Sequence, residues 1–276
     1  MPELPEVETV VRGLRPHLEG QRLVRVVQRR ADIRTAIPQD FVQRVTGARV
    51  TAVKRRAKWI LIALDRGATL LVHLGMSGRL VLVPKSAPPA GRHDHVEFET
   101  EAGATVRFGD PRRFGVVDVV ESDTLDADRR FSGLGPEPLE KSFDAAALET
   151  ALAGSRAPLK AALLDQRNVA GLGNIYVCEA LYRAGLSPLR KAGTVKGARA
   201  AVLCASIKAT LGDAIEAGGS SARDYVQASG ELGWFQHQWR VYDREGSPCP
   251  GCDCGKSVKR IVQSGRSTFY CPKRQR

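Results

Sequence analysis

The chain has 276 residues, of which 43% are hydrophobic and 26% charged, and its formal net charge is +12. The hydrophobic and charged fractions are ordinary for a globular protein, whereas the excess of lysine and arginine favours a polyanionic partner such as nucleic acid. No stretch approaches the roughly 20 apolar residues that span a bilayer, and the first residues lack the basic-then-apolar order of a secretory signal, so we expect a cytosolic protein.

The first element is predicted to be an amphipathic helix that begins almost at the start of the chain. Val7, Val10, Val11, Leu14 and Leu18 fall at helical spacing, and Gly20 ends the run. From about residue 22 to 121 short β-rich runs recur every ten residues or so, which is typical of a sandwich or barrel. These runs include 59–64, 69–74, 80–83, 95–99, 105–108 and 116–120.

A polar segment rich in proline and glycine, residues 122–142, is a plausible hinge, and helical texture follows it. The predicted helices cover 143–153, 159–165, 175–184 and 196–217, with a turn at 168–174 between two of them. A basic segment that carries cysteines closes the chain. We therefore expect an α+β multidomain protein with a β domain at 1–130, a helical domain at 131–240 and a small metal module at 241–276.

Four of the six cysteines, Cys249, Cys252, Cys254 and Cys271, lie close together near the end of the chain. In a reducing compartment such thiols are metal ligands rather than disulfides, and paired cysteines at this separation are typical of tetrahedral zinc. The second pair is broken, because Arg274 stands where its second cysteine is expected. Three interpretations stay open: all four thiols bind zinc, only three do, or the hairpin packs without metal.

The start of the chain suggests a second kind of chemistry. A small second residue favours removal of Met1, which would leave Pro2 as the terminal amine. An α-amine has a pKa near 8, so part of it is neutral and can attack a sugar aldehyde carbon to give a Schiff base. Glu3 is adjacent and could act as general acid or base. The alternative is an ordinary N-terminus with a helix-capping glutamate.

Several motifs, in order along nearly the whole chain, resemble those of the formamidopyrimidine-DNA glycosylase family. They are PELPEVETV (2–10), KRRAKW (54–59), HLGMSG (73–78), HDHV (93–96), DPRRFG (110–115), LGPEPL (134–139), GLGNIY (171–176) and GRSTFYC (265–271). The resemblance implies an N-terminal β-sandwich with a leading helix, a helix–two-turns–helix domain and a C-terminal zinc-finger β-hairpin.

The resemblance also implies roles for single residues. Pro2 would be the nucleophile toward C1′ of the damaged nucleotide and Glu3 the acid that assists ring opening. Lys58 would serve β-elimination, and Arg266, near the hairpin tip, δ-elimination. The implied DNA contacts are His93, Arg112, Arg156 and Asn174, with Met76, Arg112 and Phe114 filling the gap left by an everted base.

This resemblance implies base excision repair of oxidised purines such as 8-oxoguanine and formamidopyrimidines, with abasic-site lyase activity. The partner would be damaged double-stranded DNA, bound by a monomer at the bacterial nucleoid, with one structural Zn²⁺. We expect a loop within residues 218–238 to recognise the lesion. The chain departs from the family in its cysteines: counting back from Cys271, Cys254 holds an expected place, Cys249 stands two residues too far away, and Cys252 is extra.

Three other functions are considered. A catalytically silent damage-binding module would dispense with Pro2, Glu3 and Lys58, which are all present. An endonuclease VIII-like glycosylase for oxidised pyrimidines would open with glycine in place of Leu4. A zinc-ribbon RNA-binding protein would not require the first 120 residues.

Overall fold

A computed structural model describes residues 1–84, 86–221, 224–253 and 255–276. The contacts within the chain divide it into two compact units. Unit 1 comprises Met1–Ser132 and Ala217–Trp234, and unit 2 comprises Gly133–Glu216 and Phe235–Arg276. The finer division into three domains at 1–130, 131–240 and 241–276 stays a prediction.

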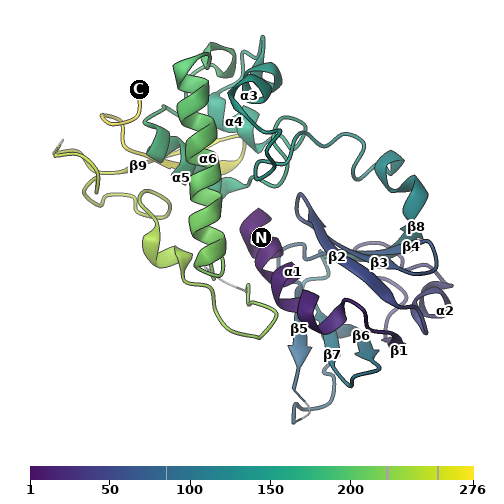
Figure 1. Ribbon diagram of the computed structural model, residues 1–276. Coiled ribbons are helices and arrows are strands. Elements are labelled where there is room, and N and C mark those ends of the chain that lie inside the picture. The colour runs from purple at the N-terminus through teal and green to yellow at the C-terminus, as the bar shows by residue number, and fades with distance from the viewer. Residues whose placement is uncertain (85, 222–223, 254) are drawn as a thin grey trace. The chain divides into compact units, whose positions relative to one another are not determined.

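Unit 1 contains two antiparallel sheets of four strands each, ordered β1-β6-β7-β5 and β2-β3-β4-β8 (Figure 1). Apolar residues of both sheets meet in one buried cluster, which confirms the predicted β-sandwich. The strands are β1 (Leu23–Gln28), β2 (Val50–Arg56), β3 (Trp59–Leu64), β4 (Ala68–His73), β5 (Arg79–Val83), β6 (Asp94–Thr100), β7 (Thr105–Gly109) and β8 (Val116–Glu121). A short helix, α2 (Phe41–Val45), and a 3-10 turn, η1 (Ser122–Ala127), complete the connections.

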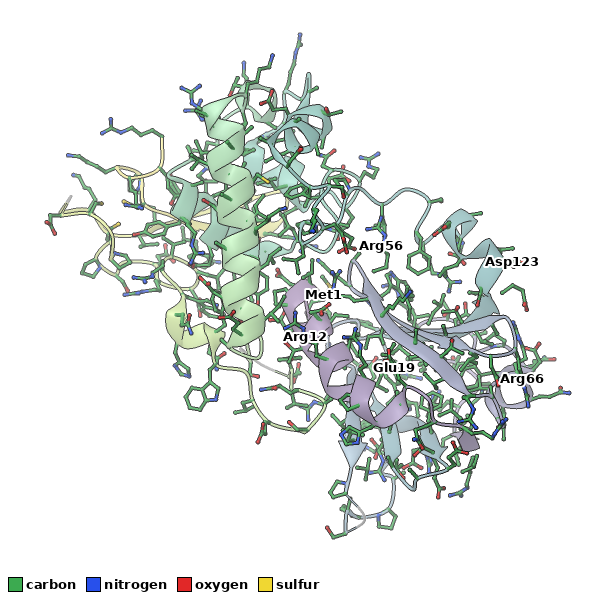
Figure 2. All side chains as sticks on the ribbon, viewed as in Figure 1. Met1, Arg12, Glu19, Arg56, Arg66 and Asp123 are labelled. Atoms are coloured by element: carbon green, nitrogen blue, oxygen red, sulfur yellow. The ribbon has the colours of Figure 1, made fainter. Side chains whose placement is uncertain are left out.

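The leading helix α1 (Leu4–Leu18) is confirmed, and it packs lengthwise into the same core. Its predicted apolar face, Val7, Val10, Val11, Leu14 and Leu18, is buried. Gly13 allows α1 to lie close to the segment 217–234, because a Cβ at position 13 would lie only 2.8 Å from the Cβ of Ala228. In Figure 2 Met1 marks one end of this helix and Glu19 the other.

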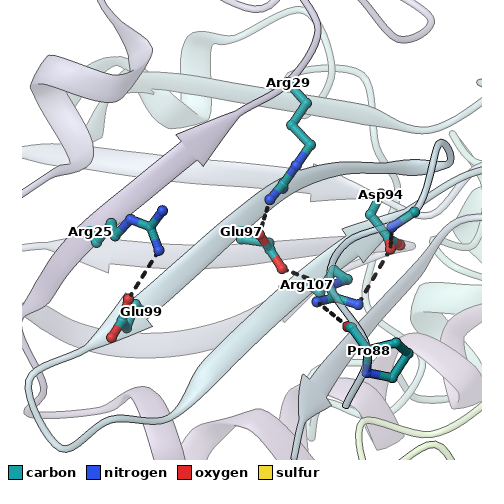
Figure 3. A network of polar contacts seen from close by, with 8 residues as sticks. Arg25, Arg29, Pro88, Asp94, Glu97, Glu99 and Arg107 are labelled. Carbon is teal, nitrogen blue, oxygen red and sulfur yellow. Dashed lines mark hydrogen bonds and ion pairs between the residues drawn. The ribbon is translucent and has the colours of Figure 1, made fainter. Parts of the chain in front are cut away.

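Charged residues cover part of the outward face of the sheet β1-β6-β7-β5 (Figure 3). Glu97 accepts hydrogen bonds from both Arg29 and Arg107, and Arg107 also reaches Asp94 at 3.4 Å. Burial alone would raise the pKa of Glu97, but the two arginines lower it below its usual value. These arginines are therefore neutralised locally.

Unit 2, in its described residues, is built from four helices and one hairpin. The helices are α3 (Ala145–Leu152), α4 (Leu159–Leu164), α5 (Asn174–Ala184) and α6 (Ala198–Glu216), with 3-10 turns η2 (Ala192–Thr194) and η3 (Phe235–Gln238). The strands β9 (Lys259–Gln263) and β10 (Arg266–Tyr270) pair antiparallel through a two-residue turn. Neither α6, which has 19 residues, nor any other helix in the described part of the chain is apolar and long enough to cross a membrane.

The burial of α1 makes a direct prediction for stability. Leu14 is completely buried, so Leu14→Ala should lower the free energy of unfolding by about 3 kcal/mol through lost apolar contact and the cavity left behind. Arg12→Ala is the matched control on the same helix, because that side chain is 57% exposed and its ion pair with Glu8 contributes little. Urea unfolding followed by circular dichroism would measure both, and equal effects of the two substitutions would contradict this packing.

Candidate active site

The two residues predicted to carry catalysis lie directly before the first turn of α1. Pro2 is buried, and Glu3, 4% exposed, is the N-cap of the helix in an extended conformation. Glu3 and Glu6 form a capping box, in which the Glu3 N–H donates to Glu6 Oε2 at 2.8 Å. Met1 is 49% exposed, so its removal would uncover the Pro2 nitrogen at a helix end that is already ordered.

Glu6 also connects this helix end to the segment 217–234. Its other carboxylate oxygen, Oε1, accepts the N–H of Ser220 at 2.7 Å. Gly219 has a φ of +83°, and a Cβ at that position would lie 3.1 Å from Glu6 Oε1. Since the Trp234 N–H donates to the carbonyl of Ala217 at 2.9 Å, the two ends of the segment are also joined to each other.

Lys58 lies on the two-residue turn between β2 and β3, where Arg56 pairs with Trp59. Lys58 is buried, with only 8% of the residue exposed. The preceding residue, Ala57, adopts a φ of +50° that shapes the turn. Arg55 braces this turn, because its Nη1 donates to the carbonyl of Ala57 at 3.0 Å while its Nε donates to Glu8 of α1 at 3.0 Å.

A neutral histidine lies beside this turn. His73 pairs with Trp59 across the sheet, and their rings lie 4.8 Å apart. Burial, together with the positive charges of Lys58 and Arg34, lowers the pKa of His73 to about 4. Its Nδ1 accepts the N–H of Gly75 at 3.0 Å, so Nε2 carries the proton at neutral pH.

The three residues predicted to fill the gap in DNA stand on two turns that contact each other directly. Gly75 has a φ of +60°, and a Cβ there would lie 2.3 Å from the backbone of Phe114, so only glycine fits. This contact places the turn of half-buried Met76 against the turn of Arg112 and Phe114. The Arg112 guanidinium lies 4.9 Å from the centre of the Phe114 ring, which is 41% exposed.

A buried carboxylate ties these two turns together. Asp110 is fully buried; it accepts the Ser77 hydroxyl at 2.5 Å and the Gly115 N–H at 2.7 Å. The Asp110 N–H in turn donates to the carbonyl of His93 at 2.9 Å, which places that predicted DNA contact beside the same turn. The structure therefore brings His93, Arg112 and Phe114 into one neighbourhood of unit 1.

In unit 2 the predicted phosphate contact Asn174 is bonded to Ser267, the residue that follows Arg266 in the hairpin. Asn174 begins α5, and its Nδ2 donates to the carbonyl of Ser267 at 2.9 Å. Lys160, which is fully buried, donates from Nζ to the same carbonyl at 2.9 Å and to the Thr268 hydroxyl at 2.7 Å. Arg266 itself is exposed at the start of β10, directly after the turn. Arg156, by contrast, lies exposed between α3 and α4, apart from these bonded groups.

The sulfur atoms of Cys249, Cys252 and Cys271 lie within 4.8 Å of one another. The Cys252 sulfur is 3.3 Å from that of Cys249 and 3.8 Å from that of Cys271. Zinc bound by thiolates at about 2.3 Å requires sulfur atoms roughly 3.8 Å apart, so these three residues fit the metal. Cys254, the fourth predicted ligand, lies outside the described residues.

Arg274 does not point toward the sulfur atoms as a fourth ligand would. Its Nη1 donates to the carbonyl of Gly251 at 2.9 Å, and its guanidinium lies 5.0 Å from the centre of the Tyr182 ring. The Tyr182 hydroxyl is 3.3 Å from the Cys249 sulfur, and burial raises the pKa of this tyrosine. Arg274 therefore takes a packing position beside the cluster.

Four residues of this arrangement had no assigned role in the sequence: Glu6, Glu8, His73 and Lys160. All four belong to motifs or helices that were recognised, but their partners are distant in the chain, up to 214 residues away for Glu6. Glu6 and Lys160 are buried charged residues, which are expected to have partners, yet nothing in the local pattern indicated their burial.

Two family models match the chain. Residues 1–117 match the formamidopyrimidine-DNA glycosylase N-terminal domain, and residues 134–226 match the formamidopyrimidine-DNA glycosylase H2TH domain. Among curated proteins, the formamidopyrimidine-DNA glycosylases of Rhodospirillum rubrum and Acidiphilium cryptum are 57% and 55% identical, and each match covers 100% of both chains.

Solved structures of similar proteins agree with these matches. The MutM (Fpg) protein of Thermus thermophilus is 42% identical with a TM-score of 0.87, covering 99% of this chain and 98% of that one. The Lactococcus lactis Fpg in complex with DNA containing N7-benzyl-Fapy-dG is 32% identical with a TM-score of 0.88, covering 99% of both chains. The same values hold for a complex of the Lactococcus lactis Fpg with DNA containing an abasic site.

The environment of His73 gives a prediction that does not require DNA. Because the charge of Lys58 disfavours protonation of His73, Lys58→Gln should raise the His73 pKa from about 4 toward the ordinary value near 6.5. A titration of the histidine ring protons by NMR would measure the midpoint. Lys54→Gln, an exposed residue on β2, is the control and should leave it unchanged. An unchanged His73 midpoint in Lys58→Gln would contradict the conclusion that the charge of Lys58 lowers the pKa of His73.

Proposed function

The chain belongs to the formamidopyrimidine-DNA glycosylase family and is a base excision repair glycosylase with abasic-site lyase activity, and we propose which of its residues perform each step. The substrate proposed is duplex DNA with an oxidised purine, 8-oxoguanine or a formamidopyrimidine. The observation that carries the proposal is the burial of the neighbouring residues Pro2 and Glu3 directly before the anchored first turn of α1.

Pro2 acts as the nucleophile once Met1 has been removed. Its secondary amine attacks C1′ of the damaged nucleotide and displaces the base, and the iminium forms when the bond between C1′ and the sugar ring oxygen then breaks. The nearby N-terminus of α1 favours the neutral amine by its dipole, which increases the fraction able to attack. Glu3 donates a proton during sugar ring opening, since its buried carboxyl sits beside the nucleophile.

Lys58 and Arg266 take part in the later eliminations. The iminium withdraws electrons from the sugar, so loss of a C2′ proton breaks the bond to the 3′ phosphate, and Lys58 serves this β-elimination. Its turn is fixed to α1 through Arg55 and Glu8, which holds it at a constant place relative to Pro2 within unit 1. Arg266 on the hairpin serves the δ-elimination that releases the second phosphate.

DNA is held by groups in both units. We propose phosphate contacts for His93, Arg112, Arg156 and Asn174, the last at a helix start, where backbone dipoles favour anions. Met76, Arg112 and Phe114 fill the space that the everted base leaves in the DNA stack. The contacts between their two turns hold these side chains in place for that role. The loop within residues 218–238, whose Ser220 N–H is bonded to Glu6, recognises the everted lesion.

Zinc is proposed to organise the hairpin that carries Arg266. Cys249, Cys252 and Cys271 would bind it together with Cys254, and the extra Cys252 would compensate for the ligand lost at Arg274. The metal supplies folding energy to a hairpin too small to have a core of its own. The relatives are bacterial, so we propose that the chain works as a monomer in the cytoplasm at the nucleoid.

The nucleophile and the acid can be separated with two substrates. On duplex DNA with 8-oxoguanine opposite cytosine, borohydride should trap an adduct, and trypsin should place it on the terminal nitrogen of the peptide 2–12. Glu3→Gln should slow adduct formation on the 8-oxoguanine duplex about a hundredfold or more but still trap a preformed abasic site, because that site already equilibrates with an open-chain aldehyde and does not need acid-assisted ring opening. Pro5→Ala, on the same turn, should trap normally, and an adduct on a lysine peptide would refute the assignment of Pro2.

Zinc occupancy is tested by metal content rather than activity. The purified protein should contain about one zinc per chain, as a closed structural site requires. Cys252→Ser should lose most of it. Cys204→Ala, a buried thiol on α6 away from the cluster, should retain it. Full zinc content in Cys252→Ser would show that the extra cysteine is not a ligand.

A further inference from the structure

Unit 2 contains a second concave site that the repair reaction does not use. A cavity of about 570 Å³ lies between α5, α6, the segment from Phe235 to Arg244, and the end of the chain near Arg274. All its lining residues belong to unit 2. None of the residues proposed above to contact substrate lines this cavity.

Positive charge dominates the wall. Four arginines line the cavity: Arg183, Arg240, Arg244 and Arg274. Arg183 is paired with Asp213, and Arg244 donates to the carbonyl of Trp239 at 3.1 Å. Arg240 is an exposed residue, and its guanidinium has no hydrogen bond or ion pair within the described segments of the chain, although its charge acts on the buried Glu179. It is therefore ready to bind an anion.

The other carboxylate of the wall is already occupied. Glu179, 4% exposed, accepts the backbone N–H groups of Arg240, Val241 and Tyr242 at 2.9, 3.0 and 2.8 Å. These bonds hold the backbone of Arg240 in place. They also occupy both carboxylate oxygens of Glu179 with backbone N–H groups. The four arginines of the wall therefore outnumber its two carboxylates, Asp213 and Glu179, and the wall carries an excess of positive charge.

Two buried polar groups in the wall lack partners. Thr210 is 2% exposed, and its hydroxyl oxygen has no hydrogen-bond partner among the described residues. The same holds for the buried indole nitrogen of Trp239. Leaving such groups unsatisfied is unfavourable, so a polar ligand or ordered water would be stabilised there.

We propose that this cavity binds a nucleotide through its phosphate groups. Arginine side chains match phosphate oxygens in charge and geometry, and the cavity falls in the size range of small-molecule sites, well above that of a bare phosphate. The indole of half-buried Trp239 offers an aromatic surface for the base. A free nucleotide and the terminal nucleotide of a single strand share this chemistry.

Isothermal titration of the full chain with dAMP tests the proposal. Saturable binding is expected, and Arg240→Gln should weaken it about tenfold, as expected for loss of one charge-assisted contact. Arg199→Gln removes the same charge from an exposed position on α6 outside the cavity and should change the affinity less than about twofold. Excess lesion-free duplex should not displace dAMP.

A second variant, Thr210→Val, should change stability and dAMP affinity in opposite directions, which a merely structural role of Thr210 would not produce. Thr210→Val keeps the shape and removes the unpartnered hydroxyl, so it should raise the melting temperature without ligand while weakening dAMP severalfold. A 5′-phosphorylated oligothymidylate that binds tighter than dAMP, and competes with it, would identify a strand end as the source; weaker binding would identify the free nucleotide. Absence of saturable binding of both probes, or equal affinity in Arg240→Gln, would overturn the proposal.

Discussion

A chain terminus is ordinarily the least ordered part of a protein, so chemistry at a terminal amine requires the first helix to be held along its length. Here that condition is met by the apolar face of α1, whose five core residues are buried in the sandwich. Polar residues of its first turns fix the helix further: Glu6 bonds to Glu3 and Ser220, and Glu8 bonds to Arg55. Both Pro2, the proposed nucleophile, and the turn of Lys58 are therefore held in place by the same helix.

One residue in this arrangement performs two tasks. Glu3 caps α1 in a reciprocal pair with Glu6, and it is proposed as the acid that protonates the opening sugar. The cap uses the carboxylate as an acceptor, whereas the acid needs a proton on the same group. Once the proton has been delivered, the carboxylate is restored as a cap, so the helix end is most stable after the proton transfer.

Periodicity in the sequence located α1 and six of the eight sandwich strands to within a residue or two, because each is long and apolar on one face. The strands β1 and β2 and the five-residue helix α2 were not singled out, since basic residues interrupt the strands and the helix is too short to show a period. The contacts that position the site could not be predicted. Glu6 and Ser220 lie 214 residues apart, and no local pattern encodes such a pairing.

The paired charges on the outer face of the sheet β1-β6-β7-β5 reduce the contribution of that face to the electric field of unit 1. Arg29 and Arg107 lie against carboxylates there, so their fields largely cancel beyond a Debye length of about 8 Å. Arg112 and Arg113 have no carboxylate partner anywhere in the described ranges. A polyanion is therefore attracted more strongly to Arg112 and Arg113 than to Arg29 and Arg107. Diffusional encounters are oriented before contact, which raises the fraction of collisions that are productive.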